Sequence, residues 1–183
     1  MAYKGKRITN LLTGQTIEFI STSKETHGKL LEMVATWEPH SKEPMEHYHP
    51  AQDESFTVLD GILTIAINGR KWALLKGDSI DIPAGATHAM WNAGSKKAVV
   101  TWKVSPALNT EYLLETGMGL ASDGKTSKNG MPGILQTTLL ARKYRDEFRL
   151  NKPPYLLQKI LFGLLTPLAL LSGKKAVYTK YID

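Results

Sequence analysis

The stretch Glu46–Gly61, EHYHPAQDESFTVLDG, decides both the fold and the chemistry that we expect of this chain. Successive side chains of a β-strand point to opposite faces, so His47 and His49 lie side by side while Tyr48 points away. Past a proline the extended pattern resumes and brings in Glu54. Two imidazoles and a carboxylate that converge on one spot are suitable ligands for a divalent metal. The stretch therefore predicts a metal site with three ligands in place and a fourth supplied from elsewhere.

The segments on both sides of this stretch are short runs that are typical of strands. Asn68-Gly69 separates two apolar runs and is a strong hairpin signal, because both turn residues tolerate positive φ. Strand-like runs cover residues 15–21, 31–37, 62–67, 71–75, 79–82, 87–92 and 98–104. Short strands with turn signals between them and no helical period indicate an antiparallel sandwich or a small barrel. The expected fold class is therefore mainly β.

A second segment, GDSIDIPAGATHAMWN, runs from Gly77 to Asn92 and contributes another histidine. Together the two segments resemble the two signature motifs of the cupin superfamily. The residues that carry the resemblance are His47, His49, Glu54 and Gly61 in the first motif, and Gly77, Pro83, Gly85, His88 and Asn92 in the second. One position departs from the pattern, because Ser41 stands where the family usually has a glycine. The resemblance covers about residues 15–106 and leaves the rest of the chain unexplained.

The resemblance implies a double-stranded β-helix, or jelly-roll barrel, as in small single-domain microbial cupins of the quercetin-dioxygenase-like type. It also implies a metal at the barrel mouth, held by His47, His49, Glu54 and His88. Three imidazoles and one carboxylate accept iron, manganese, nickel, cobalt or zinc and leave coordination positions open. The alternative is that these four side chains are polar residues at the rim of an empty barrel.

Strand alternation predicts the wall of a cavity beside this metal. Phe56 and Met90 are expected to line a substrate pocket, and Met90 is the stronger candidate because it shares the face of His88. Val58 and Trp102 are expected to belong to the barrel core. Glu54 is the candidate catalytic residue, since it can act as a ligand and as a base towards an acidic substrate proton.

The chain beyond the barrel is expected to be a helical extension, with a barrel domain over residues 1–116 and the extension over residues 117–183. The glycine-rich stretch Gly117–Gly133 is predicted to be a flexible linker, with a lid over the barrel as the alternative. Leu140, Tyr144 and Phe148 recur every four residues, which predicts an amphipathic helix docked by one face.

The last predicted helix is apolar nearly all round. Asn151 is expected to cap it, and the apolar run covers Tyr155–Leu171. Pro167 predicts a kink or a break, because it removes one hydrogen bond within the helix. The run is short for a membrane span and contains a lysine. We therefore expect it to be buried against the barrel and a second copy of the chain in a homodimer, with membrane contact unlikely because the polar face is thin.

Composition excludes several classes of function. The net charge is +6, but the lysines and arginines are scattered and do not alternate with aromatic residues, which argues against a nucleic-acid partner. The chain has no cysteine, so thiolate chemistry and disulfides are excluded. The N-terminal residues lack the apolar core of a secretory signal, and the expected location is cytoplasmic.

The function that these observations favour is that of a metal-dependent enzyme, dioxygenase-like, acting on a small and partly apolar molecule. A non-catalytic module that binds a metal or a small molecule is one alternative, since a fold does not fix a function. A metal-dependent isomerase or decarboxylase is another.

Overall fold

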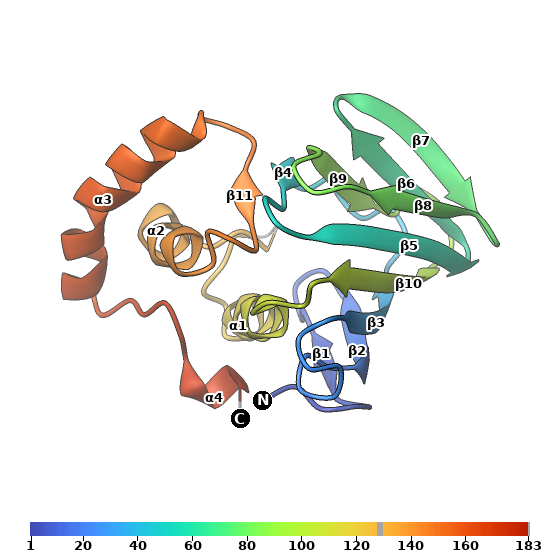
Figure 1. The fold of residues 1–183 in the computed structure, drawn as a ribbon, viewed down its shortest axis with the longest axis horizontal. Helices are drawn as coiled ribbons and strands as arrows, with labels where there is room; N and C mark the ends of the chain where they lie inside the picture. The colour runs from blue at the N-terminus through green and yellow to red at the C-terminus, as the bar shows by residue number, and fades with distance from the viewer. Residues whose placement is uncertain (128–129, 183) are drawn as a thin grey trace.

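Two antiparallel β-sheets form the body of the protein in the computed structural model, which describes residues 1–127 and 130–182. The six-stranded sheet has the order β1-β2-β3-β10-β5-β8, and the five-stranded sheet has the order β11-β4-β9-β6-β7 (Figure 1). The strands are β1 (Arg7–Thr9), β2 (Thr16–Ser21), β3 (Leu31–Trp37), β4 (His47–Tyr48), β5 (Asp53–Asp60), β6 (Ile62–Ile67), β7 (Arg70–Leu75), β8 (Ser79–Ile82), β9 (His88–Trp91), β10 (Ala98–Ser105) and β11 (Arg149–Leu150).

The strands bury every second side chain, as the alternating sequence pattern predicts. In β3 the side chains of Leu31, Met33, Ala35 and Trp37 are buried, while the residues between them are half-buried. These side chains meet those of β5, β6 and β10 in one core that fills the space between the sheets. The mainly β fold, with the jelly-roll arrangement of strands, is therefore confirmed.

Two turns show why the strands change direction where they do. Asn68 (φ 49°) and Gly69 (φ 78°) both have positive φ between β6 and β7, as the hairpin prediction requires. Gly61, between β5 and β6, also has positive φ (77°), and a Cβ added there would lie 2.1 Å from the carbonyl oxygen of Lys97. Gly61 is therefore needed both for its backbone conformation and for the close approach of the chain at the start of β10.

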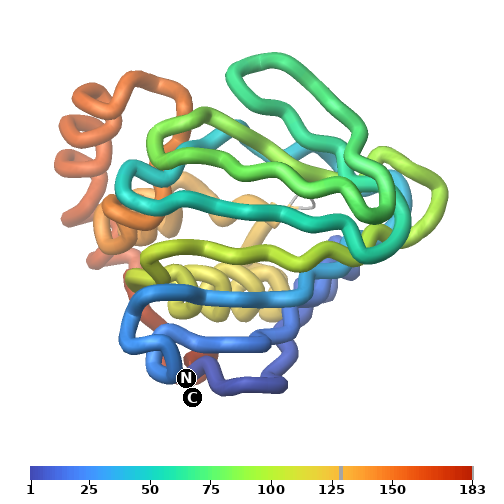
Figure 2. The backbone as a smooth tube through the Cα atoms, turned by 45° about the vertical axis from the view of Figure 1, so that its right-hand side comes forward, coloured from blue at the N-terminus to red at the C-terminus, as the bar shows by residue number. Residues whose placement is uncertain are grey.

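The helices gather on one side of the sheets, and α3 is the outermost (Figures 1 and 2). They are α1 (Thr110–Ser122), α2 (Ile134–Lys143), α3 (Tyr155–Leu171) and α4 (Thr179–Ile182). The helical extension is thus confirmed, although the expected division after residue 116 falls inside α1.

The predicted linker is wrong over its first part. Gly117 and Gly119 lie within α1, and Gly119 faces the ring of Tyr181, where a Cβ would lie 2.3 Å from the ring. The glycine therefore allows α4 to approach the helix closely, which outweighs its low helix propensity. Residues 128 and 129 of the predicted linker lie outside the described residues.

The bounds of the other two predicted helices also need correction. α2 ends at Lys143, so Tyr144 follows the helix and Phe148 lies next to β11. α3 begins after Pro154, not after Asn151, and it continues through Pro167 without a break. The period of four that linked Leu140 to Phe148 therefore joined two different elements.

α3 lies against α2 and does not bury its whole circumference in the barrel. Only Gln158, Phe162 and Ala169 of this helix are buried. The expected burial of its leucines is wrong for the chain by itself, because Leu156 is 69% exposed and Leu164 is 72% exposed. Among the described helices, none has both the length and the apolar character needed to cross a membrane.

Candidate metal centre

Three strands bring the predicted ligands together. His47 on β4 is paired directly with His88 on β9, and His49 follows β4 by one residue. One ligand atom from each of these three imidazoles lies within 4.8 Å of the others. From β5, Oε2 of Glu54 approaches to 3.2 Å from Nε2 of His49 and to 2.9 Å from Nε2 of His88. The three predicted histidine ligands therefore form one cluster, Glu54 contacts two of them, and the role of all four as ligands stays a prediction.

Backbone carbonyls orient the three imidazoles. Nδ1 of His47 lies 3.3 Å from the carbonyl oxygen of Met45, and Nδ1 of His88 lies 2.9 Å from that of Ala86. Nδ1 of His49 contacts the carbonyl oxygen of Glu147. A carbonyl oxygen can only accept a hydrogen bond, so in each neutral ring Nδ1 carries the proton and Nε2 presents a lone pair.

The inward-facing atoms fit a cation. Nε2 of His49, Nε2 of His88 and Oε2 of Glu54 are buried and have no hydrogen-bond partner within the described part of the chain. Buried polar atoms without partners are costly, and lone pairs that face one another repel. Because imidazole nitrogen and carboxylate oxygen are the donors that divalent transition metals prefer, a metal would satisfy these three atoms at once.

The charges inside the site act on one another strongly. Burial and the neighbouring imidazoles lower the pKa of His47 to about 3. Burial also lowers the pKa of His49, but the adjacent carboxylate of Glu54 outweighs it and the pKa is raised overall. Burial raises the pKa of Glu54, but contacts with His49 and His88 outweigh it and hold the pKa far below its usual value. Glu54 is therefore an ionised carboxylate at neutral pH.

Two aromatic residues outside the motifs support the ligands, and the sequence analysis missed both roles. Trp102, expected in the core, donates from Nε1 to Oε1 of Glu54 at 2.9 Å. Phe148, expected on a helix, stacks on the ring of His47 with centroids 4.8 Å apart. Phe56, expected in the pocket, is fully buried and stacks on Trp102 with centroids 5.6 Å apart. Phe56 therefore packs behind Trp102, and it is Trp102 that forms the wall of the site.

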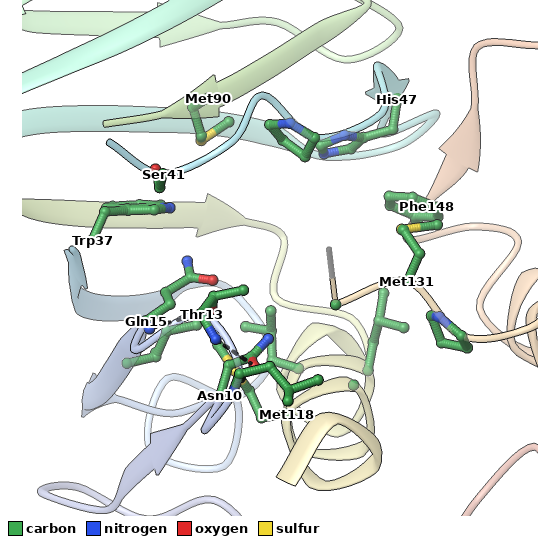
Figure 3. A pocket seen from close by; sticks show the side chains of 18 of the residues that line it. Asn10, Thr13, Gln15, Trp37, Ser41, His47, Met90, Met118, Met131 and Phe148 are labelled. Atoms are coloured by element: carbon green, nitrogen blue, oxygen red, sulfur yellow. Dashed lines mark hydrogen bonds between the residues drawn. The ribbon is translucent and has the colours of Figure 1, made fainter. Parts of the chain in front are cut away.

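A cavity of about 560 Å³ opens beside the histidines, between the barrel and the helices (Figure 3). Met90 lines it, as do Trp37 and Trp102 from the strands. The side chains that close its other sides include Met118 and Leu114 of α1, Leu140 of α2, Met131, Phe148 and Leu150. Asn10, Gln15 and Ser41 bring polar groups to the part of the lining away from the histidines. The lining also includes Thr13, Glu38, His40, Lys42, Thr110, Thr137, Tyr144 and Glu147, but most of its surface is apolar. The cavity thus suits a small molecule that is apolar over most of its surface.

Ser41, the one departure from the family pattern, takes part in the frame of this cavity. Its Oγ accepts a hydrogen bond from the backbone N–H of Asn92 at 2.8 Å, and its own N–H donates to the carbonyl of Asn92 at 2.8 Å. The side chain of Asn92 in turn donates to the carbonyls of Trp37 and Glu38. The serine therefore adds a bond that a glycine would lack.

Comparison with known proteins agrees with this geometry. The family model described as "Cupin domain" matches residues 33–104. Tetracenomycin polyketide synthase protein TcmJ of Streptomyces glaucescens is 31% identical over 61 residues, which are 33% of this chain and 41% of that protein. Quercetin 2,3-dioxygenase of Bacillus subtilis (strain 168) is 30% identical over 80 residues, 43% of this chain and 23% of that protein. The chain thus spans less than half the length of these two relatives.

The fold has a counterpart among solved structures. A protein from Thermotoga maritima described as a predicted oxalate decarboxylase superposes with a TM-score of 0.50 at 18% identity, covering 58% of this chain and 99% of the other. At that identity the likeness concerns the fold alone. The matched residues, the two motifs in place and the shared fold lead to one conclusion: residues 33–104 of this chain form a cupin domain.

Proposed function

We propose that this protein is a metal-dependent enzyme, dioxygenase-like, that acts on a small and mostly apolar molecule. The observation that carries the proposal is the set of buried, unpartnered atoms of His49, Glu54 and His88 at one end of the cavity. A bound divalent transition metal would supply Lewis acidity and open coordination positions there. The similarity to a quercetin 2,3-dioxygenase over 80 residues supports the dioxygenase-like reading.

In this proposal, different residues of the chain serve substrate binding and proton transfer. Trp37, Met90 and Phe148 offer apolar surface to a flat ring system, and they leave few polar groups that a substrate must satisfy. Glu54 is ionised and keeps Oε2 free of hydrogen bonds, so this oxygen can accept the proton of an acidic hydroxyl group. Trp102 holds the other oxygen and so fixes the direction in which the carboxylate points.

The first test is the metal itself. Elemental analysis of the purified protein should find a transition metal in a stoichiometric amount, and His88→Gln should lower the bound amount more than about tenfold, because a ligand atom is lost from a buried set. Tyr48→Phe is the matched control: its side chain points away from the ligands on the same strand, and the metal content should not change. Equal metal content in both variants would contradict the site.

The second test is the reaction. The metal-loaded protein should be screened with small hydroxylated aromatic compounds for thermal stabilisation, and each compound that stabilises it should then be tested for dioxygen consumption. Consumption of dioxygen supports the dioxygenase-like activity. Turnover without dioxygen would favour an isomerase or decarboxylase, and binding without turnover would favour a non-catalytic module; either result would overturn the proposal.

A further inference from the structure

The outer face of α3 is apolar and uncovered. At about 100° per residue, one arc of this helix is occupied wholly by apolar side chains. They are Leu156, Leu157, Ile160, Leu161, Leu164, Pro167, Leu168 and Leu171, and we call them the α3 face. The leucines and the isoleucine of this face are between 38% and 85% exposed. Such a continuous apolar surface on a helix marks an interaction site.

The ends of the α3 face are basic. Residues 150–182 contain five lysines and no acidic residue. Lys152 precedes the helix, Lys174 and Lys175 follow it, and Lys159 lies about 60° around the helix from Leu156, beside the α3 face. Within residues 1–127 and 130–182, no carboxylate lies within ion-pair distance of these four side chains; the fifth, Lys180, pairs with Asp123. An apolar surface bordered by unpaired cations complements a surface that is apolar inside and anionic at its boundary.

The same charges disfavour a second copy of the chain as the occupant. In a two-fold pair the α3 face would meet itself, and an antiparallel crossing of the helices would bring Lys152 of one copy towards Lys174 and Lys175 of the other. Repulsion between like charges would then oppose the apolar contact. Anionic headgroups, in contrast, would neutralise the lysines while the leucines enter the layer beneath them.

The length of α3 sets how it would meet a bilayer. Seventeen residues at about 1.5 Å each extend roughly 25 Å, less than the roughly 30 Å of a hydrocarbon core. A helix of this kind lies in the interfacial plane and does not span. Such helices normally need a polar face towards the protein or water, which the sequence of α3 lacks. In the fold α2 packs against α3, whose buried residues include Phe162 and Ala169, and the side chain of Gln158 donates to the carbonyls of Leu150 and Pro153, so the helix needs no polar face of its own.

We propose that α3 docks this protein on an anionic lipid bilayer, with the α3 face among the upper acyl chains and the four lysines at the headgroups. This inference replaces the expectation that membrane contact is unlikely, which rested on the thin polar face of the isolated helix. It is independent of the proposed enzymatic function, because none of its residues lines the cavity or touches a predicted ligand.

Vesicle flotation with the full chain tests the proposal. The protein should float with vesicles of phosphatidylcholine mixed with phosphatidylglycerol, and less with phosphatidylcholine alone. The double variant Ile160→Glu/Leu164→Glu should lower the bound fraction more than about tenfold, since it places two carboxylates in the face that enters the lipid. Both positions are exposed in the chain, so the thermal unfolding temperature of the variant should stay near that of the parent.

The matched control is Leu11→Glu/Leu75→Glu, which makes the same change at residues that are 71% and 54% exposed but lie away from α3. It should float as the parent does. Absence of flotation by the parent, or equal loss in both double variants, would overturn the proposal. So would a dimer, seen by light scattering, that Ile160→Glu/Leu164→Glu dissociates without any vesicle binding by the parent, because the α3 face would then be the contact between copies.

Discussion

The two oxygens of Glu54 have different surroundings, and this difference fixes the orientation of the carboxylate. Oε1 accepts the indole N–H of Trp102, while Oε2 faces His49 and His88 without a hydrogen bond. A carboxylate that is anchored through one oxygen keeps the other aimed at a fixed point. Partners of this kind, behind the ligands, typically change metal affinity by about 10- to 100-fold when they are removed.

Trp102→Phe should therefore weaken metal binding by about 10- to 100-fold while the barrel stays folded, because an aromatic side chain is kept while the indole N–H donor is lost. Isothermal titration with a divalent transition metal measures the change. Trp91→Phe is the control: Trp91 is another strand tryptophan, but it packs with Ala66 and Ala89 in a separate cluster. Equal losses of affinity in the two variants would show that Trp102 acts only through packing.

Binding of a metal should release a proton from His49. In the metal-free protein the pKa of His49 is raised, so protonation of this ring stabilises the fold below its ordinary pKa of 6.5, and that stability is lost as the pH rises through the raised value. A metal requires the neutral ring, and its affinity should therefore increase with pH across that window. Titrations in buffers with different ionisation enthalpies measure the released protons. Identical heats in all buffers would contradict the prediction.

At the residue scale, the motifs predicted the side chains that converge and missed those that hold them. Alternation placed Met90 and His88 on one face, and spacing placed Glu54. The support from Phe148 and the backbone of Glu147 could not be predicted, because it comes from a segment about one hundred positions away with no motif of its own. For Trp102 a signal existed. It is paired with Phe56 on the neighbouring strand, so the two side chains point to the same face of the sheet and cannot both occupy the same part of the cavity wall.

Among the turns between elements, the one at Gly61 combines two constraints and so offers a sharp test. Gly61→Ala should destabilise the fold by more than about 2 kcal/mol, since it adds a Cβ that overlaps the carbonyl of Lys97 to the cost of positive φ. Gly77→Ala serves for comparison: its φ is also positive (92°), but nothing lies within 4 Å of the added Cβ. Denaturant unfolding of both variants should show the larger loss for Gly61→Ala, and equal losses would refute the role of the overlap.

The elements themselves were predictable to different degrees. Strands β3, β6 and β8 begin and end as the sequence analysis predicted, because burial between two sheets imposes a period of two that few other structures share. α1 was not predicted as a helix, and its second half was read as a loop, because nothing in the local sequence shows that Gly117 and Gly119 lie in a helix against which Tyr181 packs. Helix propensity depends on the local sequence, whereas the close approach of α4 depends on the tertiary structure.

At the scale of the whole molecule, the extension serves the metal site only through a short part of its length. The contacts with the ligands come from Glu147, Phe148 and β11, and none of residues 151–182 lines the cavity. A chain that ends after Leu150 should therefore keep the metal affinity of the parent in its soluble fraction. A chain that ends after Tyr144 should bind more weakly, by about tenfold or more, because His49 loses its acceptor.

Metal titration of both truncated chains, with circular dichroism to confirm the β-sheet signal, makes the comparison. Loss of metal binding on removal of residues 151–183 alone would show that α3 supports the site from a distance. The same truncated chain should lose flotation with anionic vesicles, which would separate the part of the extension that completes the site from the part that we assign to lipid.

The contact between His49 and Glu147 joins residues 98 positions apart, and this separation has a consequence for biosynthesis. Chains emerge from the ribosome at about 5–20 residues per second, so His49 precedes Glu147 by roughly 5 to 20 s, and the complete set, once His88 has emerged, waits roughly 3 to 12 s. During that interval β4 has no partner on the side that β11 later covers. A nascent chain therefore presents the candidate metal site in an open and less oriented form until Glu147 and β11 are in place.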